Sequence, residues 1–205
     1  MDMKDLSAKG QNLTDMVNIV DVSGTIISTA TKLDAHSDGG KLHLAFSVML
    51  FFATGEVLLQ KRSSGKYHFP GKWANACCSH PRPTEDLLTA AKRRVNEELA
   101  VEADLEVAGN FIYRAQCDKS FLTEYEFDYV LVGHIDESSL SRLSPDKSEV
   151  EDMALIAPED FMETEVPKIG ESLILHKNYD IKREDLAPWF LPALSIAKEY
   201  IDKKA

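Results

Sequence analysis

The chain has 205 residues, with 34 acidic and 23 basic side chains and a formal net charge of −11. A chain of this length can bury a substantial core and is expected to form one domain. Nucleic acids and anionic membranes repel such an acidic protein, so neither is an expected partner. An anionic ligand would need a local group of cations or a metal ion.

The cysteines and the N-terminal residues bear on the compartment. Three cysteines do not favour a disulfide framework, and the first residues show neither the basic start nor the apolar stretch of a secretory signal. The apolar runs are too short to span a bilayer. We therefore expect a reduced, cytoplasmic protein that forms a single domain over residues 1–205, with residues 1–14 flexible.

The first part of the chain predicts two pairs of strands. Residues 16–32 contain two β-prone runs around Ser23-Gly24, and residues 43–63 contain another pair that turns at Thr54-Gly55. The first strand of the second pair is almost continuously apolar, which predicts a central strand covered on both faces. The tryptophan- and proline-bounded stretch at 73–83 predicts a loop.

A strong helix signal follows at residues 84–101. Thr84 is the predicted N-cap, and Glu85 and Asp86 suit the positive end of a helix. Apolar side chains recur at helical spacing in this segment: Leu87, Leu88, Ala91, Val95 and Leu99.

The second half predicts two strands and two helices. The strands cover residues 109–116 and 123–135, and a short helix is expected in the acidic segment 158–165. The last helix is expected from near Pro188 to about Lys203, with Pro192 bending or restarting it. Strands on both sides of a strong central helix predict a mixed α/β sandwich.

The strand at 123–135 carries a candidate metal site. Glu124 and Glu126 lie two residues apart, so their carboxylates project to the same side, with about 7 Å between α-carbons. Alternatively, they form a solvent-facing row of acids on an edge strand. His36, His43 and His80 lie upstream; each alone could be a structural histidine, but together with the two glutamates they suit zinc, manganese or iron better than magnesium. The remaining histidines lack such neighbours: His68, His134 and His176.

The adjacent Cys77 and Cys78 allow two interpretations. They cannot form a useful local disulfide, they lack the spacing of a zinc knuckle, and a buried cysteine is often a small hydrophobic residue. However, one of the pair lies beside His80 and ahead of a helix N-terminus, a setting that can activate a thiol for proton transfer or nucleophilic attack. Cys117 has no such neighbours and is expected to be structural.

The predicted helix resembles a Nudix box, G-x5-E-x7-R-E-U-x-E-E-x-G-U, in which U is a bulky apolar residue. Glu85, Arg93, Glu97 and Glu98 are in place, but Arg94 stands where a glutamate is expected. Losing one carboxylate of the magnesium cluster argues against hydrolysis and leaves diphosphate binding possible. Alternatively, the segment is a surface helix with i, i+4 pairs between these arginines and glutamates.

Taken together, the motifs resemble the type I isopentenyl-diphosphate isomerases, a Nudix-fold family. The segments AHSDGGKLHLAFSVMLF, KYHFPGKWANACCSHP, RRVNEELAV, FIYRAQ, TEYEFDYVLVG and APWF occur in the family's order, from about Val17 to Tyr200. The resemblance implies a Nudix-like α/β/α sandwich with a mixed β-sheet, an N-terminal β-hairpin and C-terminal helices. It also implies conversion of isopentenyl diphosphate to dimethylallyl diphosphate, by protonation of an alkene and removal of a neighbouring proton.

The resemblance also assigns residues to each part of the reaction. The catalytic residues it implies are Cys78, Glu126, Tyr113 and Trp189. Those implied for diphosphate binding are Lys32, Arg62, Lys66 and Arg94. The metal ligands it implies are His36, His43, His80, Glu124 and Glu126, with Glu98 for a second ion. Cys77 is additional relative to many bacterial relatives, and Ser79 replaces a common glycine.

The cofactors expected from the resemblance are Mn²⁺ or Zn²⁺ at the histidine and glutamate site and Mg²⁺ with the diphosphate, without a flavin. The expected partner is a small prenyl diphosphate substrate, and the protein is expected to be a monomer or a weak homodimer. The second hypothesis is a Nudix hydrolase of another diphosphate, which would use Glu97 and Glu98. The third is a non-catalytic metal-binding or partner-binding domain.

Overall fold

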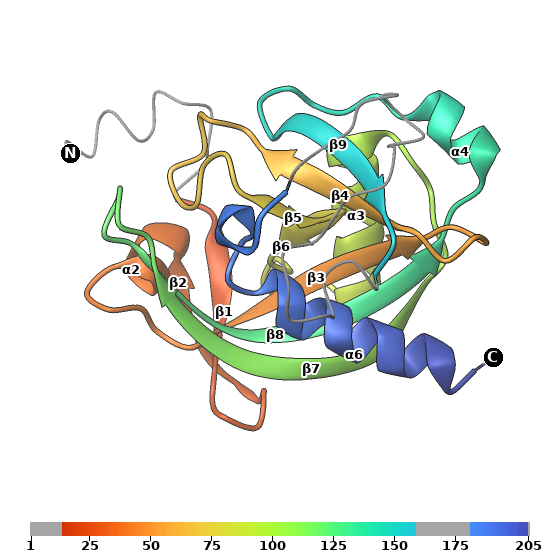
Figure 1. Cartoon of the computed structure of the whole chain (residues 1–205). Coiled ribbons are helices and arrows are strands. Elements are labelled where there is room, and N and C mark those ends of the chain that lie inside the picture. The colour runs from red at the N-terminus through yellow and green to blue at the C-terminus, as the bar shows by residue number, and fades with distance from the viewer. Residues whose placement is uncertain (1–13, 159–180, 205) are drawn as a thin grey trace.

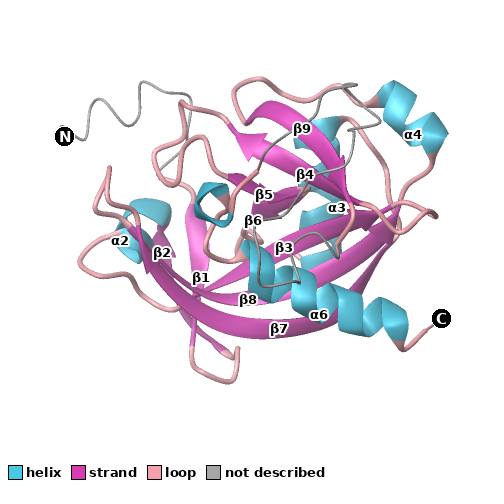
Figure 2. Cartoon of the chain, in the orientation of Figure 1, coloured by secondary structure: helices cyan, strands magenta, loops and turns pink. Residues whose placement is uncertain are grey.

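The computed structural model describes residues 14–158 and 181–204 (Figures 1 and 2). Its strands are β1 (Met16–Val20), β2 (Ile26–Thr31), β3 (His43–Phe51), β4 (Val57–Arg62), β5 (Trp73–Asn75), β6 (Cys77–Ser79), β7 (Leu105–Gln116), β8 (Thr123–His134) and β9 (Val150–Ile156). Its helices are α2 (Lys32–His36), α3 (Leu87–Leu99), α4 (Glu137–Arg142) and α6 (Phe190–Asp202), with a 3₁₀ turn at Arg183–Asp185.

A mixed sheet forms the centre of the molecule. β3 is buried along its whole length and pairs in parallel with β8, from His43 beside Glu126 to Phe51 beside His134. β7 runs antiparallel along the other side of β8, and the β1–β2 hairpin joins the start of β3. β4 continues from the far end of β3 and pairs with β5 and β9. Both predicted hairpins and the central position of residues 43–51 are confirmed.

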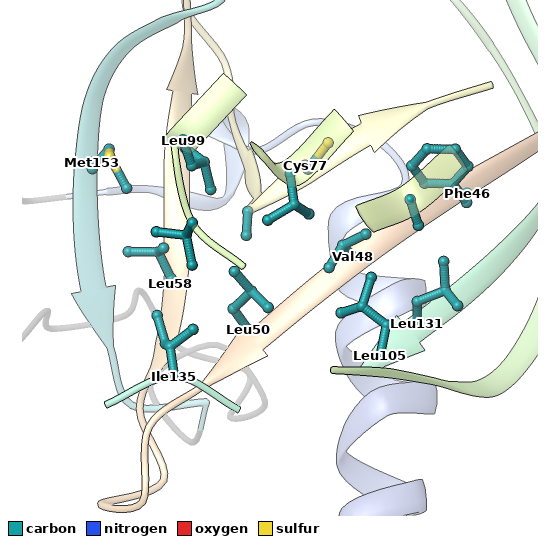
Figure 3. Packing of buried hydrophobic residues seen from close by; sticks show 14 of the residues in the cluster. Phe46, Val48, Leu50, Leu58, Cys77, Leu99, Leu105, Leu131, Ile135 and Met153 are labelled. Atoms are coloured by element: carbon teal, nitrogen blue, oxygen red, sulfur yellow. The ribbon is translucent and has the colours of Figure 1, made fainter. Parts of the chain in front are cut away.

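Helices cover both faces of this sheet. Val48 and Leu50 of β3 pack in one apolar cluster with residues of α3 (Figure 3). Met49 and Phe51, on the opposite face, pack in a second cluster with residues of α6. The alternation of side chains along one strand therefore builds two cores, and the predicted α/β/α sandwich with a mixed sheet is confirmed.

The predicted start of the central helix is wrong by a few residues. The N-cap of α3 is Asp86, whose carboxylate accepts a hydrogen bond of 3.1 Å from the backbone N–H of Thr89. Thr84 has a φ of 69°, in the left-handed region, and stands before the helix. An aspartate caps a helix at least as well as a threonine, so the helix begins after Asp86 instead of Thr84.

Other differences concern the loop at 73–83 and the last helix. The loop contains the two short strands β5 and β6, which pair with β4 and β3. Pro192 neither bends nor restarts α6, because it lies in the first turn, where its missing N–H breaks no helical hydrogen bond. The short helix predicted at 158–165 and the flexible N-terminal segment lie almost wholly outside the described residues.

Candidate active site

The two acidic residues predicted to hold a metal lie on a buried face of β8. Glu124 and Glu126 are 2% and 7% exposed, and they share the face of the strand that carries Val130 and Val132 under α6. The alternative of a solvent-facing row is therefore wrong. The parallel register sets His43 of β3 directly beside Glu126.

His36 and His80 approach the same point from two other elements. His36 ends α2, and its Nε2 lies 2.9 Å from Oε2 of Glu124. His80 follows β6, and its Nε2 lies 2.9 Å from Oε1 of Glu126 and 3.1 Å from Nε2 of His43. One ligand atom from each of the five residues lies within 4.8 Å of all the others. The structure thus brings the whole predicted set together.

The donor set of this cluster fits a cation. His36 Nδ1 lies 2.6 Å from the carbonyl oxygen of Lys32, so this nitrogen carries the proton of a neutral ring. Nε2 then carries a lone pair and faces the Glu124 carboxylate, which can only accept hydrogen bonds, so neither group can donate to the other. Burial opposes the charged imidazole, but the charge of Glu124 outweighs burial and raises the pKa of His36. The contact therefore requires a proton or a shared cation.

The size of the cluster agrees with a bound metal ion. Bonds of about 2.0–2.2 Å between zinc and its nitrogen or oxygen ligands leave opposite ligands about 4.4 Å apart. The spread of 4.8 Å among the five ligand atoms is only slightly larger. His43 Nδ1 lies 2.7 Å from the carbonyl of Lys41, the same backbone support that metal-bound histidines commonly have.

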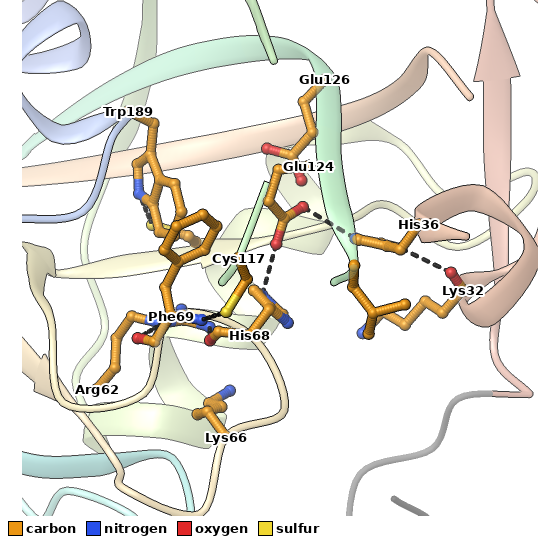
Figure 4. Close-up of polar contacts among 12 residues, drawn as sticks. Lys32, His36, Arg62, Lys66, His68, Phe69, Cys117, Glu124, Glu126 and Trp189 are labelled. Carbon is orange, nitrogen blue, oxygen red and sulfur yellow. Dashed lines mark hydrogen bonds and ion pairs between the residues drawn. The ribbon is translucent and has the colours of Figure 1, made fainter. Parts of the chain in front are cut away.

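His68 belongs to this site, although no ligand-like neighbour of His68 was recognised in the sequence. Its Nε2 lies 2.7 Å from Oε1 of Glu124, the oxygen that His36 does not contact (Figure 4). Burial lowers the pKa of His68 to about 3, so the ring is neutral and its Nε2–H donates to the carboxylate. His134 is exposed, and His176 lies outside the described residues.

The second functional group is the thiol of Cys78. Adjacent residues of β6 point to opposite faces, so Cys77 packs against α3 while Cys78 joins a cluster with Trp189 and Tyr113. The Cys78 thiol donates to Oδ1 of Asn75 at 2.9 Å. Burial and the nearby Asp128 raise the pKa of Cys78 to about 12, so the group is a protonated thiol at neutral pH.

Glu126 has a second neighbour besides the histidines. The hydroxyl of Tyr113, its partner across β7 and β8, donates to Oε2 of Glu126 at 2.5 Å. Burial and the Glu124 charge raise the pKa of Glu126, but the contacts with His43 and His80 outweigh them and the pKa is lowered overall. Burial raises the pKa of Tyr113, which keeps its hydroxyl proton.

Trp189 connects the thiol with the carboxylate. Its indole N–H donates to Sγ of Cys78 at 3.0 Å, and its ring centroid lies 5.9 Å from that of Tyr113. The ring is 2% exposed and also has the guanidinium of Arg62 at 5.3 Å from its centroid. The four predicted catalytic residues therefore form one continuous group in the order Cys78, Trp189, Tyr113 and Glu126, in which Trp189 and Glu126 are buried and Cys78 and Tyr113 are partly buried.

A cavity of about 200 Å³ opens beside Cys78, the member of this group that lines it, and cations dominate its lining. Six cationic side chains and three carboxylates line it: Lys32, Arg62, Lys66, Arg82, Arg93 and Arg94, with Asp15, Glu97 and Glu149. Burial and the neighbouring Arg62 lower the pKa of Lys66 to about 7. In a strongly acidic chain, such a local excess of positive charge is suited to an anion.

The helix α3 supplies part of this lining. Arg93 forms two hydrogen bonds with the Glu85 carboxylate, at 2.7 and 2.8 Å, and also contacts Glu97. Arg94 pairs with the buried Glu98, which also accepts from the side-chain amide of Gln60 at 3.3 Å. The predicted i, i+4 pairs thus exist, but the helix is not a plain surface helix, since its arginines line the cavity.

Two further acidic residues near the site were missed from the sequence. Glu149 contacts both Lys66 and Arg94 at the cavity wall. Asp128 continues the buried row of Glu124 and Glu126, and its Oδ2 accepts a hydrogen bond of 2.7 Å from the hydroxyl of Ser47. Burial and the charge of Glu126 raise the pKa of Asp128 well above its ordinary value.

Comparison with known proteins agrees with this geometry. Residues 41–176 match the model of the NUDIX domain family. An isopentenyl-diphosphate Delta-isomerase of Streptomyces avermitilis is 37% identical, over 94% of this chain and 88% of that protein. An isopentenyl-diphosphate Delta-isomerase of Halorhodospira halophila is 48% identical, over 57% of this chain and 67% of that protein.

Solved structures share the fold at low identity. The MutT protein of Methanosarcina mazei has a TM-score of 0.56 and 15% identity, over 80% of this chain and 95% of that chain. The NUDIX domain of NrtR from Shewanella oneidensis has a TM-score of 0.53 and 16% identity, over 77% of this chain and 87% of that chain. None of the described helices is long and apolar enough to cross a membrane. From its fold and from its relatives, the chain belongs to the NUDIX domain family and, within it, to the isopentenyl-diphosphate Delta-isomerases.

Proposed function

We propose that this protein converts isopentenyl diphosphate to dimethylallyl diphosphate. The observation that carries the proposal is the continuous group of Cys78, Trp189, Tyr113 and Glu126, whose first member, Cys78, lines a cation-rich cavity. The reaction needs a proton donor and a proton acceptor on one small hydrocarbon tail, with an anchor for two phosphates. The cavity of about 200 Å³ is below the roughly 300–1,000 Å³ of sites for larger ligands, which suits a five-carbon substrate.

In this proposal Cys78 is the acid and Glu126 is the base, which their protonation states support. Cys78 holds its proton at neutral pH because its pKa is raised to about 12, so it can donate to the terminal alkene carbon. Glu126 is a carboxylate because its pKa is lowered, so it can accept the proton lost from the carbon next to the cationic centre. The C=C electron pair forms the new C–H bond, and the electrons of the broken C–H bond form the new double bond. The reverse reaction uses the same two groups with their roles exchanged.

The tertiary carbocation between these two steps must be kept from water. Trp189 is buried at 2% exposure, and its indole N–H donates to Sγ of Cys78, so the ring lies next to the proposed proton donor and close to the substrate carbon that would become cationic. A cation–π contact in such a dry site contributes about 2 kcal/mol. Tyr113 donates to Glu126 and holds this carboxylate toward the indole.

The diphosphate lies among Lys32, Arg62, Lys66 and Arg94 in this proposal. All four line the cavity, and each provides N–H donors that suit phosphate oxygens. Arg94 stands where a Nudix hydrolase has a magnesium-binding glutamate, which supports binding of a diphosphate over its cleavage.

Metal ions complete the proposed site. His36, His43, His80, Glu124 and Glu126 would hold Mn²⁺ or Zn²⁺, which suits their mixed nitrogen and oxygen donors. Such an ion supplies positive charge that fixes Glu126 as a carboxylate. Glu98 is the proposed magnesium ligand at the diphosphate; its oxygens contact Arg94 and Gln60, so this role requires Arg94 to move toward the substrate.

A direct assay tests the function. Purified protein is incubated with labelled isopentenyl diphosphate, Mg²⁺ and Mn²⁺, without flavin, and the acid-labile allylic product is measured. Release of phosphate or pyrophosphate would favour hydrolysis, and metal binding without turnover would favour a non-catalytic domain. We further propose that the protein acts in the cytoplasm as a monomer or a weak homodimer; analytical ultracentrifugation tests the latter.

A further inference from the structure

His68 reaches the metal cluster from the segment between β4 and β5, which carries none of the proposed ligands. Its Nε2–H donates to Oε1 of Glu124 at 2.7 Å, while Oε2 of the same carboxylate faces His36 at 2.9 Å. The two oxygens thus have different neighbours, one inside the cluster and one outside it. His68 is not among the five residues whose ligand atoms lie within 4.8 Å of one another.

The segment that carries His68 is fixed at its backbone. The guanidinium of Arg62 donates to the carbonyl of His68 at 3.1 Å and to the carbonyl of Phe69 at 3.2 Å. The N–H of Phe69 donates to Sγ of Cys117 at 3.3 Å. These bonds hold the imidazole in one place before any ligand arrives (Figure 4). Cys117 therefore has a defined structural contact, as an anchor for this segment.

We propose that His68 is a positioning residue that orients Glu124 for metal binding, without being a ligand itself. Its N–H holds one carboxylate oxygen and leaves the other aimed at the ion, which is how hydrogen-bonding groups around a metal commonly support its ligands. Without this donor, Oε1 would be buried with a hydrogen bond lost, and the carboxylate could rotate away from His36. This inference rests on the metal site of the proposed function.

The test is the affinity of the metal-free full-length chain for Zn²⁺ alone, measured by competition with a chelating indicator and without substrate. His68→Leu keeps similar bulk and removes the donor, so affinity should fall by about 10–100-fold. His68→Gln keeps an N–H donor at the end of the side chain and should restore most of the lost affinity. His134→Ala, at an exposed histidine on the far end of β8, is the matched control and should bind Zn²⁺ as the parent does.

Three results would overturn the proposal. Parent-like affinity in His68→Leu would show that Glu124 needs no support. Equal loss in His68→Leu and His68→Gln would show that the N–H is not the feature that matters. A loss as complete as that of His43→Ala, without recovery by glutamine, would make His68 a ligand. Thermal unfolding of each metal-free variant separates these outcomes from misfolding, and the isomerase assay, run separately, shows whether the proposed function itself fails.

Discussion

The two faces of the central sheet differ in their role, although the same strands form both: one packs an apolar core and the other carries the candidate site. On the α3 face, β3 and β6 present Val48, Leu50 and Cys77 to an apolar core. On the opposite face, the same strands carry His43 and Cys78 into the site. Successive side chains along a strand point to opposite faces, so neighbouring residues of one strand serve the apolar core and the candidate site in turn.

The α6 face is itself divided along its length. Toward α6, β8 carries Val130 and Val132, whereas its first half carries Glu124, Glu126 and Asp128 at nearly the same burial. Buried carboxylates are costly unless they are paired or bind a cation. Apolar residues in the same places would pack without that cost, so the buried carboxylates in this half of the face indicate a chemical role.

The adjacent cysteines give the strongest test of this comparison. Cys78→Ala removes the proposed acid and should lower isomerase turnover by at least about 10²–10⁴-fold, the usual contribution of a general acid or base. Cys77→Ala should keep turnover much closer to the parent value and lower the free energy of unfolding by about 1 kcal/mol, because it reduces core packing and removes only a thiol contact with Glu98. Steady-state kinetics and urea unfolding measure the two effects. Full activity in Cys78→Ala would remove this residue from the mechanism.

Removing a ligand from the buried cluster should have the next largest effect. His43→Ala removes one of the five donors, so it should weaken the affinity for the metal by more than the roughly 10–100-fold typical of supporting residues. The tightly bound metal should therefore be depleted. Elemental analysis of dialysed protein measures the occupancy. His134→Ala, on the same pair of parallel strands, is the control. Undiminished occupancy in His43→Ala would contradict the ligand set.

Sequence alone predicted those parts of the site that lie on regular strands. Glu124 and Glu126 share a face because residues two apart on a strand do so, and His43 begins a strand that is apolar enough to be central. Their three-dimensional meeting depends on the parallel pairing of β3 with β8, which spacing alone does not fix. The resemblance to a known family supplied that step.

The site residues that the sequence did not predict lie in loops, where side chains follow neither the strand repeat nor the helical repeat. His68 is placed by the hydrogen bonds of Arg62 to two carbonyls and by the left-handed backbone of Phe69, whose φ is 45°. Glu149 precedes β9 and reaches Lys66 only through tertiary folding. Neither feature leaves a signal in a single sequence. In the sequence alone, His68, two residues before Pro70-Gly71, therefore cannot be distinguished from an ordinary loop residue.

Replacing the aromatic ring of Trp189 should lower turnover by an intermediate amount. Trp189→Leu keeps apolar bulk but removes the π-face, so turnover should fall by about 30-fold, the equivalent of about 2 kcal/mol. The Michaelis constant should change less than turnover, because Arg62 is the one proposed diphosphate contact that lies against the indole in the described part of the chain. Trp189→Phe keeps an aromatic face and should lose less. A change confined to the Michaelis constant would contradict stabilisation of the cation.

The smallest expected effect concerns the cationic wall of the cavity. In the free protein the pKa of Lys66 is about 7, below its ordinary value of 10.5, because of burial and Arg62. A bound diphosphate favours the charged amine and raises this pKa, so binding takes up a proton above about pH 7. Affinity for pyrophosphate should therefore weaken as the pH rises, by less than about tenfold between pH 7 and pH 8 from this group.

Lys66→Arg separates this effect from the titration of pyrophosphate itself. An arginine stays charged over the whole range, so the variant should lose the part of the pH dependence that Lys66 contributes. Isothermal titration of both proteins with pyrophosphate from about pH 6 to about pH 9 measures the difference. Parallel pH profiles would mean that Lys66 is already fully charged in the free protein, held so by Glu149, and that the wall is balanced before the anion binds. Diverging profiles would establish the opposite: in the free protein Lys66 gives up its proton beside Arg62, and it regains the proton only when an anion binds.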